Sequence, residues 1–330
     1  MATIKDVARL AGVSPATVSA VLNNRASVSV PLRRRVERAI RSLNYHPNAL
    51  ARGLKTRRTH TLALLVSDIR NPFYTGLVRG VEDVAQEHAY TVILGNSDRR
   101  PEKIQGYLAT LVGRRVEGVI LTHVIPRSHL EALRRQGLQV VFVDVRPRHL
   151  YADAVVVNNE EAARQAVWHL IAHGRRRIGL LGFRSGLSTG EERLAGYRRA
   201  LQEAGLRPAG LVALSRLSLE HAQEAARELL RRRPDGVFAA NNTMVLAVLR
   251  AARELGLRVP EDCALVGFDD VEWMSVAEPP VTTVAQPMYE LGAAAARCLL
   301  DRLREGKDRE PRLAALRADL VVRRSCGCEG

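Results

Sequence analysis

Three short patterns in the sequence contain side chains that could perform covalent or metal chemistry. The first, Gly186-Leu-Ser-Thr-Gly190, fits the G-x-S-x-G pattern, in which a nucleophilic serine stands on the turn directly after a strand. The nearest expected strand covers 178–181, so Ser188 stands several residues too far along the chain. His221 is the last histidine, so none follows a late acid to act as the base. The pattern therefore does not indicate a hydrolase.

The other two patterns consist of metal ligands. His169 and His173 are four residues apart on one expected helix and could share a metal ion, but the sequence shows no third ligand near them. Cys326-Gly-Cys328 could bind a metal ion or form a redox pair, yet two thiols at a frayed terminus would make a weak site. The four cysteines of the chain are too few and too scattered for a disulfide framework. We therefore expect no enzymatic activity, no metal and no cofactor.

A stretch near the start of the chain indicates a different chemistry, the reading of DNA. Thr3 can cap a helix whose apolar residues follow at helical spacing, and Gly12 can end that helix with a positive φ. Ser14 and Pro15 then supply a cap and a first-turn proline for a second helix. Two helices joined by a tight turn form a helix-turn-helix, whose second helix lies in the major groove of DNA. The alternative is an ordinary helical hairpin inside a core.

The distribution of charge favours DNA binding over an ordinary core. Residues 1–60 contain 12 Lys or Arg and only two acids, whereas the remaining 270 residues carry 38 basic and 33 acidic groups. About +10 of the formal charge of +15 is therefore concentrated where the motif stands, as a phosphate-binding surface requires. A third expected helix, which starts at Ser29 and Pro31 and stops after Leu43, completes a small head. Its arginines form either a phosphate-facing or a solvated side.

Beyond residue 60 the sequence alternates apolar runs with helical stretches. The expected strands are 62–66, 90–94, 118–121, 140–143, 178–181, 236–239 and 265–268. The expected helices include 73–87, 102–112, 160–173, 193–204, 220–231 and 245–255. Fully apolar strands that alternate with helices indicate parallel sheets covered on both faces. The units fit either two doubly wound lobes or a single barrel, and 155–159 and 281–287 resemble places where the chain crosses between lobes.

Length and composition set further bounds. With 330 residues and 46% apolar content, the chain has room for two or three folded domains. No run approaches the roughly 20 apolar residues of a membrane span, and the N-terminus has no apolar signal region. We therefore expect a cytoplasmic protein without a membrane partner. Two lobes alone would also fit a solute-binding protein, an alternative that the basic head and the missing signal region oppose.

Seven motifs stand in order along the chain. They are Thr3-Ile-Lys-Asp-Val-Ala, Gly12-Val-Ser-Pro-Ala-Thr-Val-Ser, Tyr45-His-Pro-Asn-Ala-Leu-Ala-Arg, Asn71-Pro-Phe-Tyr, Arg193-Leu-Ala-Gly-Tyr, Val266-Gly-Phe-Asp-Asp and Pro280-Val-Thr-Thr-Val. Together they resemble the LacI/GalR family of bacterial transcription regulators, the lac and purine repressor group, from Ala2 to Cys328. The resemblance implies an α/β fold, with a helix-turn-helix head and a two-lobed core like that of periplasmic binding proteins, built on doubly wound parallel sheets. The implied domains are a head at 1–47, a hinge helix and linker at 48–60, and a core at 61–330, with a first lobe of about 61–158 plus 287–315 and a second of about 159–286 plus 316–330.

The resemblance implies a repressor that binds a near-palindromic double-stranded DNA operator as a homodimer, with two second helices in successive major grooves. The family's base-reading positions fall on Pro15, Ala16 and Ala20. Many members carry arginine or another hydrogen-bonding residue where Ala20 stands, and alanine can only make contacts such as one with a thymine methyl. We therefore expect weaker direct readout at that base pair. The expected phosphate contacts come from Ser14, Thr17, Ser19, Asn23 and Tyr45.

Residues 48–55 match the family's hinge helix, which folds on DNA. The segment is about two helical turns long, too short to be stable alone. By resemblance, Leu54 would insert into the minor groove beside the same residue of the dimer mate, and Lys55 would reach the groove edge or a phosphate. Such a kink costs a few kcal/mol, so it requires a correctly spaced dimer.

The resemblance also places a small-molecule effector in the cleft between the lobes, at the carboxyl ends of the strands. The family's effector positions fall on Phe73, Tyr74, Asp144, Arg193, Asn241 and Asp269. Aromatic rings can stack on a sugar or a base, and an arginine facing an aspartate can hold hydroxyls or a carboxylate. Ordinary alternatives exist: Asp269 could cap a helix, Arg193 could pair with a neighbouring glutamate, and Phe73 could belong to the core.

Two departures from the family pattern bear on the ligand. Leu217 stands near where several members place an aromatic ring, which lowers the case for a nucleobase or an exposed pyranose face. Asn242 replaces the acid that often follows the position of Asn241. A sugar or sugar derivative remains the default expectation, and it could loosen or tighten DNA binding. Because no apolar heptad tail follows the core, we expect a dimer without a lac-type tetramerisation segment.

Overall fold

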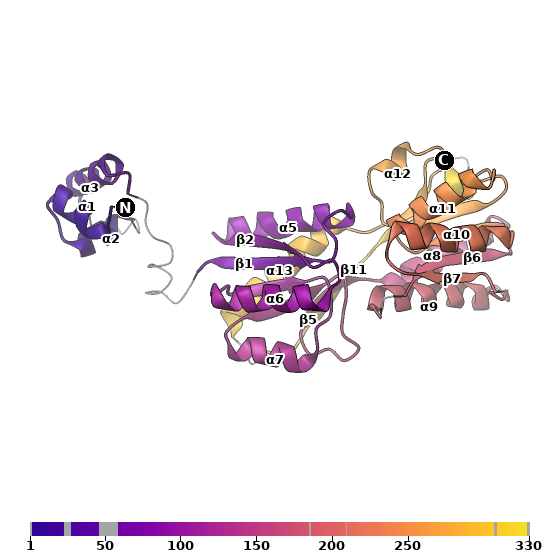
Figure 1. The fold of residues 1–330 in the computed structure, drawn as a ribbon, viewed down its shortest axis with the longest axis horizontal. Coiled ribbons are helices and arrows are strands. Elements are labelled where there is room, and N and C mark those ends of the chain that lie inside the picture. The colour runs from indigo at the N-terminus through magenta and orange to yellow at the C-terminus, as the bar shows by residue number, and fades with distance from the viewer. Residues whose placement is uncertain are drawn as a thin grey trace. The chain divides into compact units, whose positions relative to one another are not determined.

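The computed structural model describes residues 2–22, 28–45, 59–184, 186–208, 210–306 and 309–328. The chain divides into two compact units, Met1–Thr59 and His60–Gly330, which we call the head and the core (Figure 1). Within the described residues, no helix is long and apolar enough to cross a membrane.

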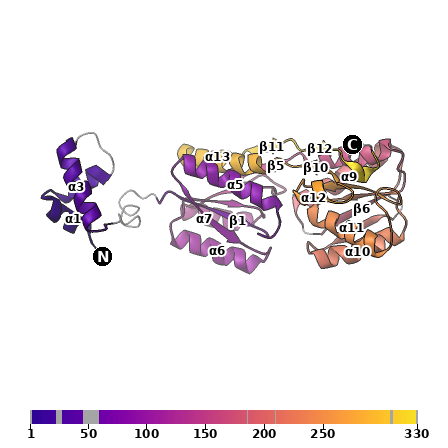
Figure 2. The ribbon, with the colours of Figure 1, turned by 90° about the horizontal axis from the view of Figure 1, so that it is seen from above.

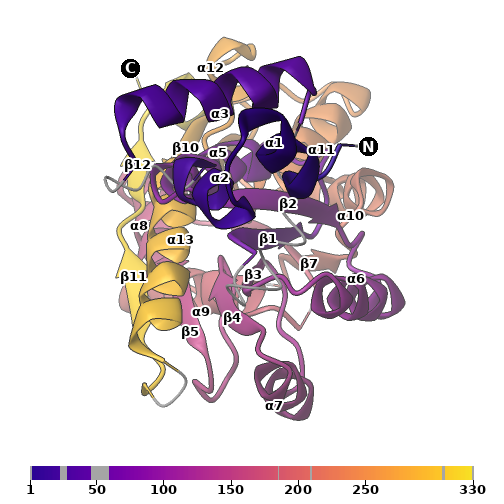
Figure 3. The same ribbon diagram turned by 90° about the vertical axis from the view of Figure 1, so that its left-hand side faces the viewer.

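Among its described residues, the head contains three short helices (Figure 3). They surround one apolar centre. They are α1 (Ile4–Ala11), α2 (Pro15–Leu22) and α3 (Val30–Ser42). Each helix contributes one fully buried valine, namely Val7, Val18 and Val36. The three helices predicted from the sequence are therefore confirmed, and a single small core holds them together.

Local residues determine where α1 and α2 begin and end. Thr3 and Asp6 form a capping box, in which the Asp6 amide donates to Thr3 Oγ1 (3.4 Å) and the Thr3 amide donates to Asp6 Oδ2 (3.0 Å). Gly12 ends α1 with a left-handed φ of 61°. At the start of α2, the Thr17 amide donates to Ser14 Oγ at 3.1 Å.

The first lobe of the core is a six-stranded sheet with helices on both faces (Figure 2). Its strands are β1 (Thr61–Val66), β2 (Thr91–Asn96), β3 (Gly118–Leu121), β4 (Gln139–Val143), β5 (Asp153–Val157) and β11 (Leu313–Leu316), and its helices are α5 (Phe73–Glu87), α6 (Pro101–Gly113), α7 (Arg127–Arg135) and α13 (Met288–Glu305). The strand order is β11-β5-β4-β3-β1-β2, and all pairs are parallel. Alternate residues of β1 enter separate cores, with Leu62 and Leu64 beside α5 and α13 and with Ala63 and Leu65 beside α6 and α7.

The second lobe repeats this arrangement. Its strands are β6 (Ile178–Phe183), β7 (Val212–Ser215), β8 (Gly236–Ala239), β9 (Ala264–Phe268), β10 (Thr282–Ala285) and β12 (Asp319–Val321), and its helices are α8 (Asn159–Ala172), α9 (Ser188–Glu203), α10 (Leu219–Arg231), α11 (Asn242–Glu254), the short α12 (Trp273–Val276) and the 3-10 turn η1 (Arg324–Cys326). The strand order is β12-β10-β9-β8-β6-β7, with only β12 antiparallel to its neighbour among the described pairs.

The chain passes between the two sheets three times: from β5 into α8, from β10 into α13, and from β11 into β12. The first and third connections are hydrogen-bonded to each other, because the Asn158 amide donates to Leu316 O (3.0 Å) and the Ala318 amide donates to Asn158 Oδ1 (2.8 Å). Two separate sheets exclude the barrel alternative. The two stretches interpreted from the sequence as crossings are 155–159 and 281–287. They also contain parts of the strands β5 and β10, which end at the connections.

Candidate functional site

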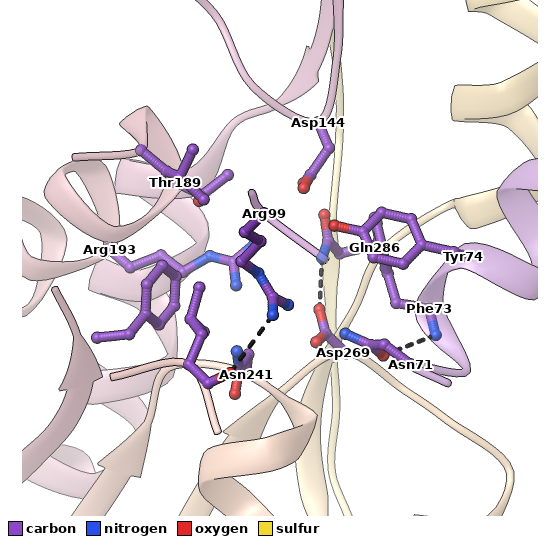
Figure 4. A pocket seen from close by; sticks show the side chains of 13 residues that line it. Asn71, Phe73, Tyr74, Arg99, Asp144, Thr189, Arg193, Asn241, Asp269 and Gln286 are labelled. Atoms are coloured by element: carbon purple, nitrogen blue, oxygen red, sulfur yellow. Dashed lines mark hydrogen bonds between the residues drawn. The ribbon is translucent and has the colours of Figure 1, made fainter. Parts of the chain in front are cut away.

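A pocket lies between the two lobes of the core (Figure 4). It is lined by Asn71, Phe73, Tyr74, Arg99, Asp144, Phe183, Leu187, Thr189, Arg193, Leu217, Asn241, Asp269 and Gln286. All six residues that the family resemblance assigned to effector binding are among them. The cavity volume is about 40 Å³, room for roughly three water molecules. A sugar-sized molecule therefore requires the lobes to separate or lining side chains such as Arg99 to move.

Arg193 of α9 is the buried cation of the pocket. Its side chain is 3% exposed, its Nε donates to Asn159 Oδ1 (2.9 Å), and its Nη1 donates to Ala240 O (2.7 Å). Its guanidinium carbon lies 3.6 Å from the centre of the Phe268 ring. Burial lowers the pKa of Arg193, and the charges of Asp269 and Asp144 act against that shift. Arg193 makes its contacts in the interior, and it does not pair with a neighbouring glutamate at the surface.

Asp269 follows β9 and is held by several donors. Its Oδ2 accepts hydrogen bonds from the backbone amide and the side-chain amide of Asn242, both at 3.0 Å, and its Oδ1 accepts from Gln286 Nε2. Because Asn242 is the first residue of α11, Asp269 does satisfy an amide at a helix start, as the ordinary alternative proposed. The same carboxylate lines the pocket, so the two roles coexist.

Asp144 follows β4 of the first lobe and is the second carboxylate of the pocket. Burial raises its pKa, the charge of Arg193 lowers it, and the charges of Asp269 and Glu192 raise it, which leaves the pKa at about 7. Near neutral pH this carboxyl group can therefore either accept or donate a hydrogen bond to a bound molecule.

The aromatic wall of the pocket comes from the start of α5. The Phe73 amide at the start of the helix donates to Asn71 Oδ1 at 3.0 Å. The Phe73 and Tyr74 rings meet edge to face with centroids 5.1 Å apart. Phe73 is 3% exposed and belongs to the apolar core, so the core alternative also applies to it. Burial and the charge of Asp144 raise the pKa of Tyr74 to about 12, so its hydroxyl remains a donor at neutral pH.

Several polar contacts cross the cleft from one lobe to the other. Asn242 Nδ2 donates to Asn71 Oδ1 at 2.7 Å. Arg99, which is labelled in Figure 4, donates from its Nη1 to Leu217 O at 3.4 Å. On another side, Arg146 Nη2 lies 2.9 Å from Glu192 Oε1. These contacts hold the lobes together around the pocket, and a change in the lobe angle must break them.

The pocket is linked to a lobe connection through Asn159. This residue starts α8 directly after the first connection, accepts from Arg193, and donates from its Nδ2 to Glu192 Oε2 at 3.0 Å. Glu192 in turn pairs with Arg146 of the first lobe. Arg193 is therefore connected through Asn159 and Glu192 both to the first lobe connection and to the first lobe.

Some residues that line the pocket were not predicted from the sequence to belong to the site. They are Asn71, Arg99, Phe183, Leu187, Thr189 and Gln286, whereas Leu217 was expected near the ligand and lies there. Leu187 and Thr189 belong to the G-x-S-x-G run, and Gln286 belongs to a stretch interpreted only as a crossing. Ser188 Oγ accepts from the Arg146 amide at 3.0 Å, so this hydroxyl joins the lobes. The usable signal was that each of these residues lies between the last residue of a strand and the first turn of the helix that follows it.

In the head, the described DNA-binding candidates lie on or beside α2. Ser14, Pro15 and Ala16 are exposed, Thr17, Ser19 and Ala20 are partly exposed, and Tyr45 packs partly buried against the head core. Ser14 Oγ and Thr17 Oγ1 also share a hydrogen bond of 2.9 Å. Asn23, Leu54 and Lys55 lie outside the described residues, so their predicted roles stay predictions.

Comparison with known proteins agrees with this arrangement. Residues 3–48 match the family model of bacterial regulatory proteins of the lacI family, and residues 167–326 match a periplasmic binding protein-like domain. The chain is 36% identical over 330 residues to the HTH-type transcriptional repressor PurR of Photobacterium profundum, with 98% of each chain covered. It is 38% identical over 320 residues to the ribose operon repressor of Escherichia coli, covering 95% of this chain and 96% of that one.

Two solved structures extend the likeness to the whole fold. One is the lac repressor dimer bound to operator and the anti-inducer ONPF, at 28% identity and a TM-score of 0.88, with 98% of this chain and 99% of that chain covered. The other is the complex of the transcriptional regulator CelR with cellobiose, at 37% identity and a TM-score of 0.75, with coverages of 98% and 100%. With a confirmed helix-turn-helix head and two parallel-sheet lobes, this chain is a DNA-binding regulator and not an enzyme, and it belongs to the LacI family of bacterial transcriptional repressors.

Proposed function

We propose that this protein represses transcription as a homodimer that binds a near-palindromic operator and is switched by a small polyhydroxylated effector in the interlobe pocket. The observation that carries the proposal is that Asp144 of the first lobe meets Arg193 and Asp269 of the second in one pocket. A ligand held by groups from both lobes has a different affinity for open and closed cores, which is the condition for a switch.

The composition of the pocket supports a sugar-like effector. Two carboxyl groups accept hydrogen bonds, whereas Arg99, Arg193, Asn241 and Gln286 can donate them, and hydroxyls of a sugar can match both kinds. The rings of Phe73, Tyr74 and Phe183 supply apolar contact for its carbon skeleton. The CelR structure with cellobiose and the ribose operon repressor are relatives whose names point to the same class of ligand.

The surface of α2 supports major-groove binding. Its residues carry no charge, so base contacts would be made by small side chains such as Ala16 and Ala20. The positive charge needed for phosphates comes from the rest of the basic head. In this proposal, affinity for the operator depends mainly on contacts with the DNA phosphates and on the paired hinge segments, and less on hydrogen bonds to bases.

The test is selection of bound sequences from a random DNA pool by the full-length protein, followed by anisotropy titrations of the enriched duplex with pentoses, hexoses, disaccharides and nucleobases. We expect an enriched near-palindrome, a dimer at sedimentation equilibrium, and at least one sugar that changes the operator Kd. The sign of that change distinguishes an inducer from a co-repressor. The proposal is wrong if no sequence is enriched, or if nucleobases alone change the Kd.

Matched variants separate the two halves of the proposal. Arg193→Met should keep operator binding and lose the response to the effector, because Arg193 lines the pocket and does not belong to the head. Arg199→Met changes an exposed arginine on the same helix, which pairs with Glu203, and should leave both properties unchanged. Ala16→Asp should abolish operator binding through repulsion of the DNA phosphates while effector binding persists.

A further inference from the structure

Three metal-ligating side chains meet in the second lobe, outside the effector pocket. They are His169 of α8, Cys326 of η1 and Cys328, and their ligand atoms all lie within 4.8 Å of one another. Cys326 Sγ lies 3.0 Å from Cys328 Sγ, which in turn lies 3.4 Å from His169 Nε2. Both expectations about these residues are corrected: His169 has further ligands nearby, and the thiols do not stand at a frayed end.

Specific hydrogen bonds hold the cysteine segment in place. Ser325 Oγ donates to Leu265 O (2.7 Å) and accepts from the Thr282 amide (2.8 Å), which fastens η1 to β9 and β10. Cys326 is fully buried, and Thr282 Oγ1 lies 3.1 Å from its Sγ. Gly327 has a φ of 90°, and this left-handed turn brings Cys328 back beside Cys326. The two thiols are therefore positioned by the fold.

We propose that His169, Cys326 and Cys328 form a binding site for a thiophilic metal ion, for which Zn²⁺ is the test ion. Two thiolates and one imidazole are a ligand set that zinc accepts. Tetrahedral zinc geometry requires about 3.8 Å between two sulfurs and about 3.5 Å between sulfur and nitrogen. The 3.4 Å between Cys328 Sγ and His169 Nε2 already fits. The two sulfurs, 3.0 Å apart, must separate by about 0.8 Å, which rotation of the partly exposed Cys328 side chain would allow. With three ligands among the described residues, a fourth position remains for water or an added thiol.

The proposed metal site is separate from the effector pocket. Ser325 bonds to residues at the amino ends of β9 and β10, whereas Asp269 and Gln286 of the pocket directly follow the carboxyl ends of these strands. The two sites therefore lie at opposite ends of the same strands, roughly 15 Å apart, which is about the length of a strand. A bound ion would fasten η1 to α8, the helix that starts at the first lobe connection. The inference does not depend on the identity of the effector.

The test uses the full-length protein, reduced and kept free of oxygen, with Zn²⁺ titrated against a competing chelator and Co²⁺ added as a spectroscopic probe. We expect one ion per chain at this site and a thiolate-to-cobalt charge-transfer absorption. Cys328→Ala and His169→Gln should each weaken zinc binding at least about 100-fold and remove that absorption. Both side chains are partly exposed, so these variants should fold, which equal unfolding midpoints without metal would establish.

Two control variants lie outside the proposed ligand set. His173→Gln changes the histidine whose ring centre lies 4.4 Å from that of His169 but whose Nδ1 bonds to His169 O. Cys298→Ala removes a thiol in the first lobe, next to Arg309. Both should keep the affinity and the absorption. The proposal is overturned if Co²⁺ produces no thiolate absorption or if the ligand variants bind zinc like the parent.

Discussion

The two lobes of the core use the same backbone position for two different carboxylates. Their strand orders correspond one to one, so β4 of the first lobe occupies the place of β9 in the second. Asp144 follows β4 and Asp269 follows β9, with left-handed φ values of 69° and 73°. Such values are uncommon for residues other than glycine, and at both places they turn the chain at the carboxyl end of a parallel strand beside the pocket.

The surroundings of the two aspartates make them chemically different. Asp269 accepts two hydrogen bonds from Asn242 and one from Gln286. The carboxylate of Asp144 accepts no hydrogen bond from the described residues, and burial raises its pKa to about 7. The second lobe therefore presents an anion fixed by donors, whereas the first presents a group that titrates near neutral pH. The repeated fold supplies the position, and the neighbouring side chains decide the chemistry.

The largest effect should come from removal of the cation that both aspartates face. In Arg193→Met, Asn159 and Ala240 O lose their donor, and the buried Asp269 and the partly buried Asp144 lose a nearby positive charge. We expect a loss of about 3–5 kcal/mol in the free energy of unfolding and no measurable effector binding. Urea unfolding and calorimetric titration measure both quantities. An unchanged free energy of unfolding would mean that the charge of Arg193 does not stabilise the two aspartates.

A second comparison concerns close helix crossings, which occur in both lobes. A Cβ at Gly196 of α9 would lie 2.1 Å from Glu160 O of α8, and one at Gly80 of α5 would lie 2.0 Å from Tyr289 O of α13. Gly196→Ala and Gly80→Ala should each reduce the free energy of unfolding by about 1–3 kcal/mol, because the helices must separate. Only Gly196→Ala should also weaken effector binding, since Arg193 stands one turn before it.

The control for these crossings is Gly106 of α6, where an added Cβ meets no atom within 4 Å. Gly106→Ala should stabilise the core by up to about 1 kcal/mol through reduced backbone freedom of the unfolded chain. Thermal unfolding distinguishes the three variants. Equal effects of all three substitutions would contradict the assignment of close packing to the crossings.

The difference between the aspartates predicts a pH dependence of stability. Because the folded-state pKa of Asp144 is raised from 3.8 to about 7, the folded protein binds more protons than the unfolded one between these values. The stability contributed by this group is therefore complete below about pH 4 and is lost as pH rises through 7. Asp144→Asn should be more stable than the parent by about 1–2 kcal/mol at pH 8, with the difference vanishing near pH 4.

Denaturant unfolding of the two proteins from pH 4 to pH 8 checks this prediction. Asp269→Asn is the matched comparison, because it removes charge from a carboxylate that accepts from a helix-start amide. It should lose stability at pH 8 instead of gaining it. If both variants changed stability in the same direction at pH 8, the two lobes would not differ as described.

The smallest effect should come from a single contact across the cleft. Asn71→Ala removes the acceptor of Asn242 Nδ2 and the acceptor of the Phe73 amide. We expect a loss of about 0.5–1.5 kcal/mol in effector binding, at most about tenfold in Kd. Small-angle scattering should show a larger core radius in the variant without ligand. A radius equal to that of the parent would indicate that the other cross-lobe contacts suffice.

Local signals in the sequence were enough for most of the secondary structure. Thr3, Gly12 and Ser14 determine helix ends through contacts within a few residues, so α1 and α2 could be placed directly. Apolar runs located β1, β3, β4, β6, β8 and β9, because these strands are nearly fully buried. The short strands β7, β11 and β12 are only partly buried, and they were not predicted.

Only the tertiary structure decided which distant residues share a site. The family resemblance named Asp144, Arg193 and Asp269, but the hydrogen bonds of Asp269 to Asn242 and Gln286 depend on the packing of α11 and β10 beside β9. His169 and Cys328 are 159 positions apart, and they meet because Ser325 fastens η1 to the sheet. Side-chain periodicity reports the burial of one element, whereas contacts between elements depend on the assembled core, which no local pattern encodes.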